Sequence, residues 1–170
     1  MKSSLKKLLA GSVLTGVAFS YSVANAVTVN NTATVDIVAP LTVVANNDMD
    51  FGKLVQPTTG SVTAIVSDAG ALTGTADYID STGAQGTVNI SGSSTETVSI
   101  TITDTTAITG LSLSAFSGTF GGQALVSGSL TGATLTGGTD VFNIGATLTV
   151  DSTVATGTHS PSYDVAVNYE

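Results

Sequence analysis

The chain has 170 residues, of which four are lysine or arginine and twelve are aspartate or glutamate, so its formal net charge is −8 at pH 7. So few cations cannot make the many phosphate contacts that binding to nucleic acid or to anionic lipid requires, and we expect neither as a partner. There is no cysteine, which excludes disulfides as a source of stability.

The first 26 residues have the pattern of a secretory signal peptide. Lysines near the N-terminus form a positive n-region, an apolar run follows over 8–20, and Ala24-Asn25-Ala26 fits a small-x-small cleavage site. A membrane anchor is the alternative, but the run is shorter than the roughly 20 residues that a spanning helix needs. We therefore predict cleavage after Ala26, export through the periplasm to the cell surface or medium, and no membrane insertion after cleavage.

The next segment, residues 27–39, alternates apolar residues with Thr, Asn and Asp. A period of two predicts a strand with one apolar face. Pro40 interrupts the pattern and cannot donate a ladder hydrogen bond, so it belongs at a strand boundary. We divide the chain there, into an extension over 27–39 and a β-domain over 40–170 whose first strand begins at Leu41. The apolar residues of the extension are Val27, Val29, Ala33, Val35 and Ile37.

The rest of the chain reads as many short strands. Its Thr, Ser, Gly, Ala and Val favour strands and turns over helices, and we expect almost no helix. Turn signals lie at Asp68-Ala69-Gly70, Thr82-Gly83, Gly121-Gly122 and Gly137-Gly138. The spacing predicts an all-β sandwich or small barrel. The alternating runs cover 62–66, 87–90, 98–103, 111–116, 141–150 and 163–169.

Nothing in the sequence predicts catalysis. A nucleophile needs a nearby base, and the single histidine, His159, stands in a turn-like stretch with no motif around it. The carboxylate pairs Asp48/Asp50 and Asp77/Asp80 lack the aromatic platforms of a glycosidase, and the chain has no tryptophan. We expect neither enzymatic activity nor a cofactor.

Two ligand classes stay open. The stretch 46–50, Asn-Asn-Asp-Met-Asp, offers oxygen atoms for calcium, but it lacks the spacing of an EF-hand loop, and a turn capped by these side chains is the alternative. A carbohydrate-binding surface needs exposed aromatic residues, and these are few. We expect Tyr78, Phe116, Phe120 and Phe142 to belong to the core.

The C-terminal end carries the most specific pattern. Apolar residues alternate up to a penultimate tyrosine, and a glycine stands fourteenth from the end; the residues are Gly157, Tyr163, Val165, Val167 and Tyr169. This pattern resembles the C-terminal strand of chaperone-usher pilus subunits. The motifs APLTV, Asp50-Phe51-Gly52 and VAVNY are also similar to a related family of secreted, cysteine-free β-domains from Gram-negative bacteria.

The resemblance implies a fold and a function. Pilus subunits are immunoglobulin-like antiparallel sandwiches that lack their final strand, and the N-terminal extension of a neighbour fills the gap by donor-strand exchange. By this resemblance residues 27–38 are the donor strand and the C-terminal strand borders the groove. The expected partners are other copies of the chain in a filament that supports adhesion or biofilm, a periplasmic chaperone and an outer-membrane usher. The alternative is an extension that folds back, giving a self-complemented, monomeric secreted adhesin, coat or carbohydrate-binding module.

Overall fold

The computed structural model describes residues 26–170, so nearly all of the predicted signal peptide lies outside the described residues. The chain divides into two units, Met1–Val35 and Asp36–Glu170. The second unit includes the last residues of the extension as well as the β-domain over 40–170. We call this β-domain the body, and every strand found in the described residues belongs to it. No helix occurs within 26–170, and consequently none long and apolar enough to cross a membrane.

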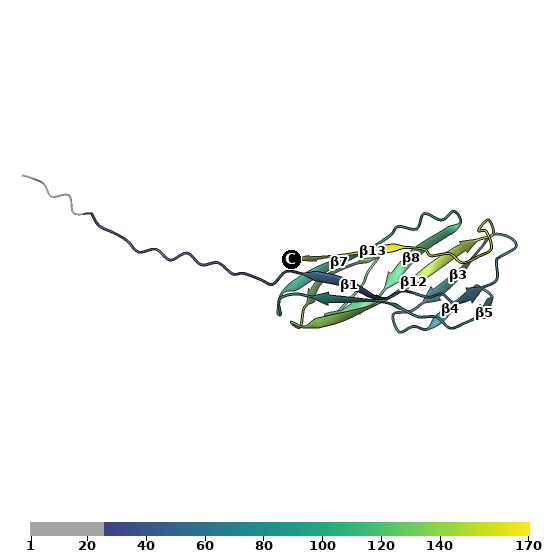
Figure 1. Cartoon of the computed structure of the whole chain (residues 1–170), viewed down its shortest axis with the longest axis horizontal. Coiled ribbons are helices and arrows are strands. Elements are labelled where there is room, and N and C mark those ends of the chain that lie inside the picture. Colours follow the sequence, from purple (N-terminus) through teal and green to yellow (C-terminus); the bar gives the residue numbers. More distant parts are fainter. Residues whose placement is uncertain (1–25) are drawn as a thin grey trace, which may run out of the picture. The chain divides into compact units, whose positions relative to one another are not determined.

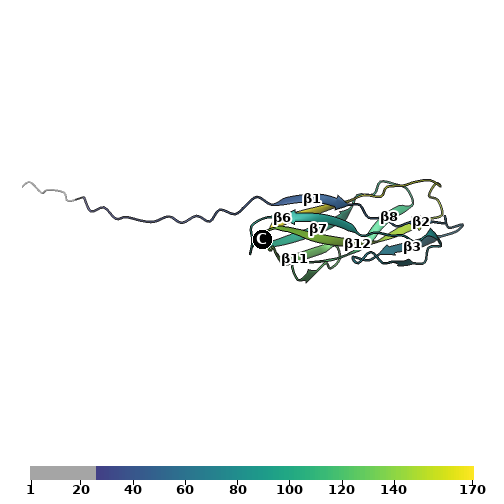
Figure 2. The ribbon, with the colours of Figure 1, turned by 60° about the horizontal axis from the view of Figure 1, so that its bottom comes forward.

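One face of the body is a six-stranded antiparallel sheet (Figures 1 and 2). The long strand β12 organises it, because it pairs with β6 along its first half and with β3 and β8 along its second half. β1 forms one edge and β4 the other. The strands are β1 (Thr42–Asn47), β6 (Gly86–Ser91), β12 (Thr139–Asp151), β3 (Ser61–Val66), β4 (Leu72–Gly74) and β8 (Leu111–Ser117).

The opposite face is a three-stranded antiparallel sheet in the order β11-β7-β13; β7 and β13 are labelled in Figure 1 and β11 in Figure 2. Its strands are β11 (Ser129–Thr134), β7 (Thr97–Asp104) and β13 (Tyr163–Tyr169). Two short ladders complete the body. They pair β2 (Lys53–Leu54) with β5 (Tyr78–Asp80), and β9 (Thr119–Phe120) with β10 (Gln123–Ala124).

Alternate residues of both sheets meet in a single apolar core. Val98, Ile100 and Ile102 of β7 are buried, and Phe142 and Ile144 of β12 are fully buried in the same cluster. Burial of each such side chain stabilises the fold by about 1.5–3 kcal/mol. The predicted all-β antiparallel sandwich is confirmed. Tyr78 packs against the core partly exposed, whereas the other three aromatic residues assigned to the core are buried in it: Phe116, Phe120 and Phe142.

All six alternating runs of the sequence are strands. β11 was not predicted because Gly132, with φ +69°, interrupts its alternation and shifts its register against β7. The ladders of β2 with β5 and β9 with β10 are too short for a periodicity to show. The Gly121-Gly122 turn signal is confirmed, since both residues have positive φ and join β9 to β10.

Gly145 lies where β12 changes partners, and the backbone there is crowded. A methyl group on Gly145 would overlap the Val66 carbonyl oxygen and would lie 2.6 Å from the Asp68 amide nitrogen. Both are backbone atoms, at the end of β3 and in the turn that follows it, so they cannot rotate away as a side chain could. The close approach of β3 to β12 therefore requires glycine at this position.

Gly145→Ala should destabilise the body. Overpacking of this kind costs about 1–3 kcal/mol, and urea unfolding of the purified protein measures the free energy directly. Gly138→Ala is the matched control, because a methyl group added at Gly138 would have no atom within 4 Å. Equal stability of the two variants would show that the β12 crossing tolerates a side chain.

Candidate functional site

The first and last strands of the body are edge strands that leave one side of their backbone unpaired. Within residues 26–170, β1 pairs only with β6, and β13 pairs only with β7. The two belong to different sheets and share no ladder. Unpaired edges attract further strands, and stable proteins usually cover, shorten or twist them.

An open pocket of ≈ 1230 Å³ lies between β1 and β13, and we call it the groove. Val43 and Ala45 of β1 form one wall, and Tyr163 and Val165 of β13 form the other. Its floor consists of core residues from the strands between: Val88, Leu111, Leu113, Leu148 and Val150. Along this line the core residues are still largely buried, but each keeps a small exposed surface.

The exposure of individual side chains agrees with an uncovered groove. The floor residues Leu111 and Val150 retain 9% and 7% of their surface, whereas Phe142 and Ile144 on the same sheet have none exposed. On the wall, Val43 is 39% exposed. The inward face of β13, from Tyr163 to Tyr169, is only partly buried. A further strand laid in the groove would contact the floor residues and Val43 together.

The two tyrosines of β13 reach across to the opposite sheet, at the start of β6 and just past its end. A methyl group at Gly86 would overlap the Tyr163 hydroxyl, and one at Gly92 would overlap the Tyr169 hydroxyl. The Tyr163 ring also packs on Phe116, with ring centroids 5.6 Å apart. Glycine at 86 and 92 therefore gives the tyrosines the space to hold the two sheets apart at either end of β13.

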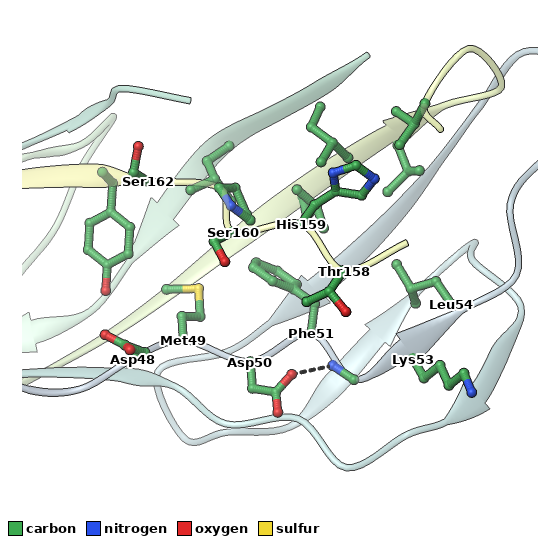
Figure 3. Close-up of a pocket in the computed structure, with 18 of the residues that line it drawn as sticks. Asp48, Met49, Asp50, Phe51, Lys53, Leu54, Thr158, His159, Ser160 and Ser162 are labelled. Carbon is green, nitrogen blue, oxygen red and sulfur yellow. Dashed lines mark hydrogen bonds between the residues drawn. The ribbon is translucent and has the colours of Figure 1, made fainter. Parts of the chain in front are cut away.

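The end of the groove next to the start of β13, which we call the loop end, is bordered by loops. Thr158, His159 and Ser160 lie on one side, and Asp48, Met49 and Phe51 lie on the other (Figure 3). Gly157, one of the residues predicted for the C-terminal strand, lines this end of the groove from the loop before β13, with φ +144°. Tyr163 and Val165 line the groove as well. Val167 and Tyr169 continue the same face of β13 against the core.

The polar groups at this end serve the local backbone. The Asp50 carboxylate accepts a hydrogen bond from the Gly52 amide at 2.8 Å (Figure 3), the geometry of a side-chain-capped turn. His159 is exposed, and its Nε2 lies 2.7 Å from the Ala155 carbonyl oxygen. Over residues 26–170 no three His, Cys, Asp or Glu side chains are grouped to hold a metal ion. Burial, and then the nearby Asp48 charge, raise the pKa of Tyr163 and keep its hydroxyl neutral.

Asp104 fixes the floor of the groove from the end of β7. Its carboxylate accepts hydrogen bonds from the amides of Thr106 at 2.8 Å and Leu113 at 3.0 Å. Burial raises the pKa of Asp104, but these bonds and one from the Thr106 side chain outweigh it, so the pKa lies below its usual value. The sequence signal is Asp-Ser/Thr-Thr, which recurs at 80–82 and 151–153 with the same aspartate-to-threonine bonding.

The extension, residues 27–39, is exposed throughout. Residues 26–41 form no strand, and the apolar side chains predicted to face a groove are open to solvent. Val27, Val29, Val35 and Ile37 are between 75% and 85% exposed. The structure brings together the predicted C-terminal residues but does not pair the predicted donor residues with any strand.

Comparison with known proteins places the body in a family. Residues 41–169 match a family model described as a domain of unknown function, DUF4402. The match begins directly after Pro40 and ends at Tyr169, so it spans β1 to β13 and leaves the extension outside. No curated protein and no solved structure matches the chain.

Asp104→Asn should weaken the body and reduce its acid sensitivity. Because the folded-state pKa of Asp104 is lowered, its charge stabilises the fold above about pH 4, and this contribution is lost as the pH falls further. With partial exposure taken into account, we expect a loss of about 1 kcal/mol at pH 7. Urea unfolding at pH 7 and near pH 3 measures both effects.

The control for this variant is Asp77→Asn, at an exposed residue next to β5. It should change the free energy of unfolding by less than about 0.5 kcal/mol at either pH. If the free energy of unfolding falls by the same amount between pH 7 and pH 3 in Asp104→Asn and in the unmodified protein, the hydrogen bonds to the Asp104 carboxylate do not stabilise the body.

Proposed function

The chain belongs to the DUF4402 family, and we propose that it is a structural subunit of a bacterial surface filament assembled by donor-strand exchange. In this proposal the groove of one copy receives the extension of another. The subunit is exported through the periplasm, supports adhesion or biofilm as part of the filament, and carries out no chemistry itself.

The observation that carries the proposal is the open groove between β1 and β13. Its floor is apolar core, and both of its backbone edges are unpaired. A single extended strand supplies what both features lack, since its backbone pairs with the edges and every second side chain enters the floor. A small molecule would cover the apolar floor but leave the edges without partners.

The extension has the properties of such a strand. Residues 27–38, at roughly 3.3 Å per residue, span about 40 Å, and the 7 residues of β13 span about 23 Å. The most exposed of its large apolar residues lie on one face when it is extended, whereas Val38 lies on the other; they are Val27, Val29, Val35 and Ile37. At about 1.5–3 kcal/mol for each large side chain, their burial would contribute about 10 kcal/mol before ordering costs.

Donor and groove are different surfaces, so the contact between copies is heterologous. Contacts of this kind do not close on themselves in general, and they propagate into open filaments. A subunit with an empty groove exposes apolar core, so it needs temporary cover during export. The proposal therefore includes a periplasmic chaperone that lends a strand and an outer-membrane usher that exchanges it.

Replacing the apolar face of the extension should abolish assembly. We expect Val29→Asn, Val35→Asn and Ile37→Asn together to give exported subunits without filaments, because the donor side chains would no longer enter an apolar floor. Electron microscopy of surface material and size-exclusion chromatography would detect the loss.

The control changes the other face of the same segment. Thr28→Asn, Thr32→Asn and Thr34→Asn together should leave filaments intact, since these residues point away from the groove when the odd-numbered residues point in. Filaments that persist in the first variant at normal abundance would rule out the extension as donor.

A further inference from the structure

The residue that joins the extension to the body is tied to it through a set of three hydrogen bonds. The Ala39 amide donates to Ser93 Oγ at 2.6 Å, and the Ala39 carbonyl accepts from the Tyr169 hydroxyl at 2.9 Å. The Ser93 amide donates to the same tyrosine hydroxyl at 2.8 Å. We call Ala39, Ser93 and Tyr169 the latch. It ties the segment just before β1 to the penultimate residue.

Packing fixes the position of the tyrosine hydroxyl in the latch. Gly92 leaves just enough room for it, and Leu135 and Leu41 lie beside the same space. The Tyr169 ring is partly buried against the core. Since ring and hydroxyl are both held, the Ala39 peptide groups have partners whose positions are set by the fold and not by the extension.

The latch matters because a fold-back of the extension would start here. To lie beside β1 in its own groove, the segment 27–38 must reverse direction just before Leu41. The tightest reversal is a two-residue hairpin turn with Ala39 and Pro40 at its centre. The favoured turn types need positive φ at both central residues or at the first one.

Neither turn type fits these residues. The proline ring fixes φ near −65°, which excludes the first type at Pro40. The second type requires positive φ at Ala39, which costs about 1–2 kcal/mol for a residue with a Cβ atom. Ala39 is not among the non-glycine residues of the described chain that have positive φ. If the chain reversed direction before Ala39, the latch would be preserved. Ile37 and Val38 would then lie in the loop, and the strand available to fill the groove would be shorter.

We propose that the latch, together with Pro40, keeps each subunit's extension out of its own groove. The extension is then available only to a second copy of the chain, so the junction selects intermolecular over intramolecular complementation. The inference rests on the proposed filament function and adds to it a partner choice made by residues outside the groove and outside the donor face.

The test converts the junction into one that permits fold-back. Ala39→Asn with Pro40→Gly supplies the residues that the two-residue turn favours, and Tyr169→Phe removes the latch hydroxyl while keeping the ring. We expect the triple variant to be monomeric. In size-exclusion chromatography its ratio of monomer to assembled chain should rise about tenfold or more, the change that 1.4 kcal/mol produces. Amide hydrogen exchange should show residues 28–38 protected in that monomer.

Tyr78→Phe is the matched control. It removes a tyrosine hydroxyl that donates to a backbone carbonyl, that of Thr73 at 2.6 Å, outside the groove and the junction. It should assemble as the unmodified chain does. If the triple variant also assembles like the unmodified chain, the latch does not select the partner, although the filament proposal stands.

Two further outcomes are decisive. A triple variant that is monomeric but leaves residues 28–38 unprotected has not closed on itself, and this would overturn the latch as the barrier to fold-back. If the unmodified chain is itself monomeric on the surface of the cells that export it, the filament proposal fails at its first step, and the two failures are therefore distinguishable.

Discussion

The unpaired backbone edges of β1 and β13 impose the constraint on which the rest of this molecule depends. Each strand has hydrogen-bond partners on one side only, and apolar core lies uncovered between them. Contact of core side chains with water is unfavourable even where it is small, and leaving two strand edges free invites pairing with other chains. A body built in this way either receives a further strand or remains prone to indiscriminate association.

The body is built so that the groove stays open without the sandwich closing over it. Tyr163 and Tyr169 span from one sheet to the other and rest over Gly86 and Gly92. Asp104 ties the end of β7 to Leu113 in the floor. A bulge after Ala45 bends β1 where it reaches the loop end of the groove. These contacts hold the walls apart and do not depend on what fills the space between them.

Composition suits a chain whose stability comes from packing and pairing alone. Without cysteine there are no covalent ties, and the apolar core joins both sheets into one cluster. Three aspartates stabilise local turns. Those at 80, 104 and 151 each accept a hydrogen bond from the amide of the threonine two residues later. The excess of acidic residues adds repulsion between copies, which favours solubility over unspecific clustering.

The sequence by itself determined the fold class and the location of the long strands. Any strand that buries one face alternates apolar and polar residues, as β7, β12 and β13 do, whichever strands it pairs with. It also marked the residues of β13. It did not reveal β11, whose alternation Gly132 interrupts, nor the glycines under the tyrosines, since their role is to leave space for side chains that lie far away in the sequence.

Only the tertiary structure decided that β1 and β13 border one groove, that Leu111 and Val150 form its floor, and that Tyr169 holds Ala39. The contacts of β1 and Ala39 with β13 join the start of the body to its last strand. Local periodicity reports which face of a strand is buried, but it contains no information about which distant strands become neighbours.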